Sequence, residues 1–131
     1  MWETYGEDVQ FYVVYIREAH AIDSAVPLGG EEDPGLGGGA NPIMEDPVTF
    51  EERQAAATTC ATKLALEPMP MLVDDMDDTA NKAFFAWPER LYLIGADGKV
   101  AYTGAPGPGG FDPDGLEEAI ENHLAALMEA E

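Results

Sequence analysis

The most constraining feature of this chain is an unbroken apolar run at residues 10–16, QFYVVYI. Polar and apolar residues do not alternate in it, and β-branched and aromatic side chains are abundant. This pattern is typical of a strand covered on both faces, as in parallel sheets that are flanked by helices. The run therefore predicts an α/β fold.

Length and composition fit one domain spanning residues 1–131. With 131 residues, 46% of them apolar, the chain is long enough to bury a core and too apolar for a disordered acidic tail. No apolar stretch approaches the roughly 20 residues that cross a bilayer, and residues 1–8 lack the basic and apolar regions of a signal peptide. We therefore expect no membrane association and a cytoplasmic location.

The charge balance of the chain is extreme. Asp and Glu number 26 against 6 Lys and Arg, which gives a formal net charge of −20. Such a chain repels phosphate backbones and anionic lipid surfaces, so neither nucleic acid nor a membrane is an expected partner. Because the acids are scattered through every segment, we interpret them as an adaptation to concentrated salt and not as a surface for one cationic partner.

Two helices have clear start signals. Thr49 and Glu52 form a capping box, which predicts a helix from there to about Leu66. Asp112 followed by Pro113 predicts the start of the last helix, since Asp accepts hydrogen bonds from the first turn and Pro suits its first position.

The remaining signals are shorter. Residues 69–74 predict a strand, residues 79–87 a short helix with inward-facing Phe84 and Trp87, and residues 88–94 another strand. Asp97-Gly98 is a hairpin signal that returns the chain along residues 100–104.

The order of these elements points to a fold. A hairpin that is entered through a proline and closed by a C-terminal helix matches the second half of a thioredoxin-like fold, with a mixed sheet flanked by helices. In that fold the entering proline is cis and faces the active site, and a cis bond implies a tertiary reason. Pro88 is therefore our candidate cis-proline.

Two acidic segments are better interpreted as surface than as ligand sites. Residues 27–47 form an acidic Gly/Pro loop without a Lys-Ser/Thr pair, so a flexible loop is preferred over a phosphate cradle. Residues 74–78, DDMDD, lack the Gly and the distal Glu of a calcium loop. We interpret them as a solvated turn that caps the next helix, and we predict no metal site.

The single cysteine, Cys60, excludes an intramolecular disulfide and any Cys-x-x-Cys redox pair. It shares a helical stripe with Ala56 and Leu64, away from the helix N-terminus and the basic neighbours that activate thiols. We interpret Cys60 as a small core residue. His123, near the edge of the last helix's apolar stripe, is expected to be partly exposed and not a ligand.

Four motifs resemble the iodothyronine deiodinases and their bacterial relatives. The first, YIREAHAID, spans residues 15–23 at the end of the first strand. PMLVD at 70–74, PERLYLI at 88–94 and DGKVAYTG at 97–104 follow in the order that the family has. The resemblance covers nearly the whole chain except the acidic glycine loop.

This resemblance implies a thioredoxin-like fold with selenol- or thiol-dependent reduction, such as removal of iodine from a phenolic ring, with a thiol reductant and no further cofactor. Glu18 and His20 match positions that the family uses beside the selenium and for substrate, and Arg90 matches an arginine associated with the substrate's acidic end. An imidazole can deliver a proton, a carboxylate can orient it, and a guanidinium can grip a carboxylate. Taken without the resemblance, all three residues have ordinary explanations as polar or ion-paired surface.

The resemblance places the family's nucleophile, a selenocysteine or cysteine at a helix N-terminus, before residue 11. Residues 1–5 supply only the last turn of that helix, so we expect an N-terminally truncated fold that lacks the first strand, the nucleophile helix and the nucleophile. Either the gene product is this short, or the true start lies upstream of Met1, beyond a selenocysteine codon. An in-frame Cys or UGA codon upstream would favour the second hypothesis.

Loss of that central strand would leave two strand edges unpaired, each unsatisfied backbone group costing about 1–3 kcal/mol. We expect these edges to pair between subunits, which predicts a homodimer. The leading function is a deiodinase-like redox protein that is inactive alone. The alternative is a noncatalytic dimeric binding or structural module of the same fold, and a metal-binding acidic protein ranks third.

If the acidity is an adaptation to salt, added ions must stabilise the fold. We expect the melting temperature, followed by circular dichroism, to rise as KCl increases from the millimolar to the molar range, because screening weakens repulsion among the acids. A melting temperature that stays constant or falls would contradict this interpretation.

Overall fold

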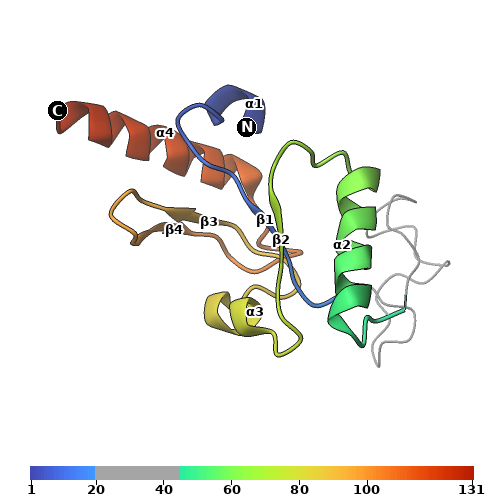
Figure 1. Cartoon of the computed structure of the whole chain (residues 1–131). Helices are drawn as coiled ribbons and strands as arrows, with labels where there is room; N and C mark the ends of the chain where they lie inside the picture. Colours follow the sequence, from blue (N-terminus) through green and yellow to red (C-terminus); the bar gives the residue numbers. More distant parts are fainter. Residues whose placement is uncertain (20–44) are drawn as a thin grey trace. The chain divides into compact units, whose positions relative to one another are not determined.

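The computed structural model describes residues 1–19 and 45–131, and it shows a mixed α/β protein (Figure 1). The α/β class expected from the sequence is confirmed. The elements in chain order are α1 (Trp2–Tyr5), β1 (Val13–Tyr15), α2 (Phe50–Lys63), β2 (Met71–Val73), α3 (Thr79–Phe84), β3 (Tyr92–Ile94), β4 (Val100–Thr103) and α4 (Pro113–Glu129). They form two compact units, one from Met1–Gln10 with Phe84–Glu131 and a second from the described part of Phe11–Ala83.

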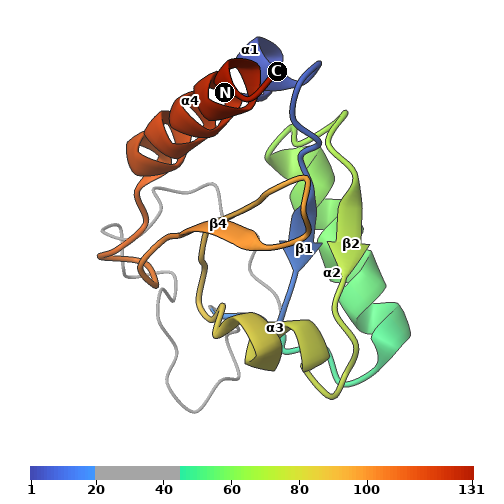
Figure 2. The same ribbon diagram turned by 90° about the vertical axis from the view of Figure 1, so that its left-hand side faces the viewer.

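The second unit is built on a parallel strand pair. β1 lies beside β2 with Val14 opposite Leu72 and Tyr15 opposite Val73, and both views show the two arrows next to each other (Figures 1 and 2). The Asp74 N–H closes the ladder by donating to the Tyr15 carbonyl at 2.9 Å. The predicted strand is confirmed, and its ladder with β2 spans Val13–Tyr15.

Helix α2 begins where the capping box predicts. The Glu52 N–H donates to Thr49 Oγ1 at 3.2 Å, and the Thr49 N–H donates back to Glu52 Oε2 at 3.2 Å. Two of the amides that a helix start leaves without partners are thereby satisfied. The helix ends at Lys63, slightly before the predicted end at Leu66.

The other unit contains the predicted hairpin. β3 and β4 pair antiparallel with Tyr92 opposite Thr103. Gly98 has φ +77 in the turn between them, a conformation that glycine adopts without steric cost. The Asp-Gly signal in the sequence thus corresponds to the observed turn.

Helix α4 packs on this hairpin. Asp112 caps it by accepting from the Gly115 N–H at 3.0 Å, as predicted. Leu116 and Ile120 on its apolar stripe are buried, and Ile120 is only 1% exposed. Further along the same stripe Leu127 is exposed. The apolar stripe therefore serves as core only in the first half of the helix.

Helix α1 lies against α4 within the same unit, as both views show (Figures 1 and 2). The Tyr5 hydroxyl donates to Glu121 Oε1 at 2.7 Å. That hydrogen bond is the main cause that raises the pKa of Tyr5 to about 12. Among the described residues, none of the helices has the length and apolarity needed to cross a bilayer.

Two details differ from expectation. The described strands form a parallel pair and a separate antiparallel pair, not one mixed sheet, because no described strand bridges β1 and β3. Phe84 and Trp87 are exposed and do not face inward. For Trp87 the reason is that α3 ends at Phe84 and Phe85 takes φ +48, so helical spacing no longer applies beyond that point. Most of the predicted 27–47 loop, residues 27–44, lies outside the described residues.

Candidate functional site

Glu18 lies three residues beyond the end of β1 and is held by the last residue of that strand. The Tyr15 hydroxyl donates to Glu18 Oε2 at 2.5 Å, and the Ala19 N–H donates to Oε1 at 3.2 Å. Tyr15 and Glu18 are both half-buried. Glu18 is therefore an oriented hydrogen-bond acceptor, unlike a solvated residue that merely follows a strand.

The environment of Tyr15 determines which partner carries the proton. Burial is the main cause that raises the pKa of the Tyr15 phenol well above its usual range, and the hydrogen bond to Glu18 and the charge of Glu18 add to it. The phenol therefore keeps its proton at neutral pH and acts as the donor, while the carboxylate of Glu18 accepts. Such a carboxylate is suited to receive or relay a proton.

Cys60, on α2, is within electrostatic range of this pair. Burial first, and then the negative charge of Glu18, raise the pKa of the Cys60 thiol. Since the thiolate is the nucleophilic form, both effects make this cysteine less reactive at neutral pH. This supports the interpretation of Cys60 as an unreactive residue, although it is half-buried and not fully in the core.

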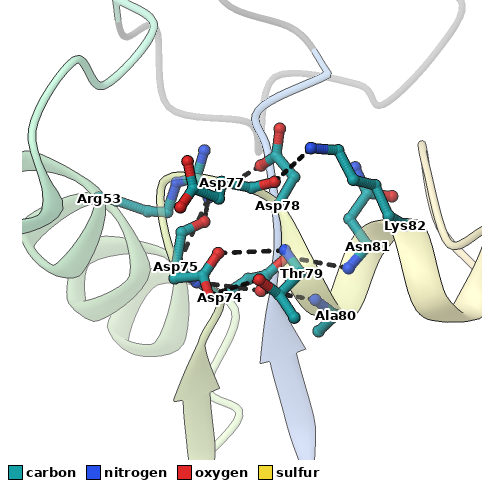
Figure 3. A network of polar contacts seen from close by, with 9 residues as sticks. All are labelled: Arg53, Asp74, Asp75, Asp77, Asp78, Thr79, Ala80, Asn81 and Lys82. Carbon is teal, nitrogen blue, oxygen red and sulfur yellow. Dashed lines mark hydrogen bonds and ion pairs between the residues drawn. The ribbon is translucent and has the colours of Figure 1, made fainter.

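The acidic run after β2 is a helix cap, as the sequence predicts (Figure 3). Asp74 is buried, and its two carboxylate oxygens accept from the Ala80 and Asn81 N–H groups at 2.9 Å each. Asp75 accepts from the Thr79 hydroxyl and N–H, and the hydroxyl is the main cause that lowers the pKa of Asp75. The aspartates thus satisfy the orphan amides of α3.

Arg53 enters this turn from α2 and is only 3% exposed (Figure 3). Its Nη1 donates to the carbonyls of Asp74 and Asp75 at 3.4 and 2.5 Å and pairs with Asp78 Oδ1 at 3.0 Å. Its Nε is buried without a partner. In residues 1–19 and 45–131 there is no group of three or more His, Cys, Asp or Glu side chains that could hold a metal ion.

Arg90, in the first unit, is held by backbone carbonyls. Its Nε donates to the Gly104 carbonyl at 2.7 Å, its Nη1 donates to the Phe85 carbonyl at 3.3 Å, and its guanidinium lies 5.5 Å from the centre of the Tyr92 ring. Within the described chain no carboxylate is at ion-pair distance from it. The guanidinium is thus oriented by two backbone carbonyls.

Exposed aromatic side chains accompany Arg90. Phe84, Phe85 and Trp87 are 42%, 77% and 45% exposed, and the Phe84 and Tyr92 rings pack edge-to-face with their centroids 5.0 Å apart. The Tyr92 hydroxyl donates to the Phe84 carbonyl. The Trp87–Pro88 peptide bond is cis. We call Phe84, Phe85, Trp87 and Tyr92 the aromatic cluster.

The residues that the sequence singled out are distributed over both units. Glu18 belongs to the second unit, and Pro88 and Arg90 belong to the first. His20 lies outside the described residues.

Tyr15 and Arg53 were missed by the sequence reasoning. Arg53 had a usable signal, because it precedes the buried Ala56 and Ala57 by three and four residues and so lies on their helical face. Tyr15 carried only the weak signal of a polar-tipped side chain at the end of an apolar strand.

Comparison with known proteins gives one consistent result. The family model described as Iodothyronine deiodinase matches residues 1–124. Thyroxine 5-deiodinase of Sparus aurata is 30% identical over 130 residues, which cover 97% of this chain and 43% of the relative.

Two further relatives agree. The human thyroxine 5-deiodinase is 28% identical over 119 residues, 91% of this chain and 35% of the relative. Type I iodothyronine deiodinase of Xenopus laevis is 28% identical over 111 residues, 85% of this chain and 38% of the relative. The chain spans less than half the length of these curated relatives.

The placement of Cys60 beside Glu18 is testable. Replacing Glu18 by Gln removes a negative charge that raises the thiol pKa, so the Cys60 pKa should fall and alkylation by iodoacetamide should speed up at neutral pH. Glu51→Gln, at an exposed position in the first turn of α2, is the matched control and should leave the pH profile unchanged. If the alkylation rate depends on pH in the same way in the unmodified protein, Glu18→Gln and Glu51→Gln, Glu18 does not act on Cys60.

Proposed function

Because this chain belongs to the iodothyronine deiodinase family, we propose that it has a thioredoxin-like fold and takes part in selenol- or thiol-dependent reduction of a halogenated aromatic substrate. The observation that carries the proposal is the hydrogen bond from the Tyr15 hydroxyl to Glu18 Oε2, at 2.5 Å. Both residues lie within residues 1–124, which match the family model. A cytoplasmic location remains part of this proposal.

The proposed reaction replaces a C–I bond by a C–H bond. A selenolate or thiolate takes the iodine from the aryl carbon, and that carbon receives a proton. Two equivalents of a thiol reductant then break the resulting Se–I or S–I bond, leave as a disulfide and release iodide with the regenerated nucleophile. Glu18 is the proposed proton-handling group, oriented by Tyr15 and joined by His20.

We propose that Arg90 and the aromatic cluster bind the substrate. The guanidinium is held by two carbonyls, and a donor that is already oriented loses little conformational freedom when it binds a carboxylate. The aromatic cluster beside it offers exposed π surfaces for an aromatic ring. Pro88, two residues before Arg90, is proposed to contribute to the same binding surface, as the resemblance implies.

The nucleophile is proposed to come from outside residues 1–131. Cys60 is the only cysteine of the chain, lies inside α2, and has its thiol pKa raised by burial and by Glu18. The chain by itself is then inactive.

Iodide release from an iodinated phenol, with dithiothreitol as reductant, tests this proposal. The chain alone should show no release above the blank, whereas a form extended upstream to include an in-frame Cys or selenocysteine should release iodide. In the extended form, Glu18→Gln should lower kcat by about 10²–10⁴-fold, the usual contribution of general acid–base groups. Arg90→Gln should mainly raise KM.

Glu51→Gln in the extended form is the control and should keep full activity, because Glu51 is exposed on α2. Activity of the unextended chain would refute the external nucleophile. Unchanged kcat in Glu18→Gln would refute the role of the carboxylate.

A second candidate is a noncatalytic dimeric module of the same fold. The observation that favours it is that, among the described strands, β1 pairs with β2 and β3 pairs with β4, and no described strand bridges the two pairs. A strand edge is a template for pairing with another chain.

We therefore expect a homodimer, measured by light scattering at micromolar concentration in moderate salt. Val14→Pro, in the middle of β1, should weaken the dimer because proline removes the amide donor of that residue. Thr58→Ala on the exposed side of α2 is the control. A monomer in the unmodified protein would rule out both the dimer and this second function.

A further inference from the structure

We propose that Arg53 is the positioning residue of the Tyr15–Glu18 pair: a buried cation on α2 that fixes the end of the β1–β2 ladder from which the pair extends. The inference rests on the proposed role of Tyr15 and Glu18 and goes beyond it, because it assigns a function to a side chain in another element.

A short chain of hydrogen bonds connects Arg53 to Tyr15. The Tyr15 carbonyl accepts from the Asp74 N–H at 2.9 Å, and the Asp74 carbonyl accepts from Arg53 Nη1 at 3.4 Å. Asp74 is therefore held on one side by β1 and on the other by α2. Figure 3 shows Arg53 reaching from α2 into the turn that follows β2, beside β1. Arg53 thus contacts the same residue whose N–H forms the last rung of the ladder.

Burial gives this cation a long electrostatic reach. Arg53 is 3% exposed, so solvent screens its charge poorly. Asp78 is the one acid in an ion pair with it among the described residues, and Asp78 is partly exposed. Burial, and then the hydrogen bond and charge of Glu18, raise the pKa of the Tyr15 phenol, and the charge of Arg53 opposes them with a smaller effect. Arg53 thus acts on the pair through charge as well as through position.

A purely structural role for Arg53 makes a different prediction. If the side chain only ties α2 to the turn before α3, losing Arg53 or its partner Asp78 should disturb the second unit in the same way. If Arg53 acts on Tyr15 by charge, the two substitutions have opposite signs. Removing the cation raises the phenol pKa, whereas removing the acid leaves the cation less neutralised and does not raise it.

The experiment places 3-fluorotyrosine at position 15, since fluorine makes the phenol more acidic and brings its titration closer to the measurable range. Its ionisation is followed by ¹⁹F NMR against pH in the full chain. Arg53→Met should raise the titration midpoint by about one unit, the size expected for a nearby opposite charge. Arg53→Lys should raise it less because the charge is kept. Asp78→Asn should leave it unchanged or lower it.

Equal midpoints in Arg53→Met and the unmodified chain, or a rise in both Arg53→Met and Asp78→Asn, would overturn the inference. If Arg53→Met fails to fold by circular dichroism, Arg53→Gln, which also removes the charge but keeps an N–H donor, and Asp78→Asn decide it. A rise in both, or no change in either, overturns the inference, and a rise confined to Arg53→Gln supports it.

The same measurement separates this inference from the proposed function. In one outcome, the titration midpoint of residue 15 depends on Arg53 as expected, but the extended protein releases no iodide. That outcome would refute the proposed function and leave Arg53 as the positioning residue of the pair. An active extended protein whose residue 15 titrates independently of Arg53 would refute only the inference.

Discussion

Arg53 is a buried cation, with only 3% of the residue exposed to solvent. Removing an ion from water costs several kcal/mol unless hydrogen-bond acceptors replace the water. The replacements are the carbonyls of Asp74 and Asp75 and the carboxylate of Asp78. All three belong to the link between β2 and α3. One side chain therefore joins α2, β2 and the start of α3, and the geometry of the second unit follows from that requirement.

In the other unit, too, an arginine donates to backbone carbonyls. In a chain with 26 acids and 6 basic side chains, an arginine has many carboxylates to pair with. Arg90 nevertheless gives its donors to the carbonyls of Gly104 and Phe85. Both arginines thus hold backbone, which leaves each guanidinium oriented and its charge only partly neutralised. That arrangement suits a positioning role for Arg53 and an anion-binding role for Arg90.

Local signals in the sequence predicted local structure well. The capping box at Thr49, the Asp112 cap and the Asp97-Gly98 turn all depend on hydrogen bonds or dihedral preferences within a few residues, so they do not need the rest of the chain. Predictions that needed packing were weaker. Trp87 was expected to face inward because helical spacing was extended past Phe84, but the helix ends there and Trp87 is exposed.

The sequence by itself determined the α/β class, the starts of the helices, the hairpin turn and the identity of Glu18 and Arg90 as candidates. Only the tertiary structure decided that Arg53 is buried among carbonyls, and that burial and the charge of Glu18 raise the pKa of the Cys60 thiol. The physical reason is that desolvation and electrostatic coupling depend on which residues distant in the sequence come within a few ångströms of each other. Spacing along one helix or strand carries no such information.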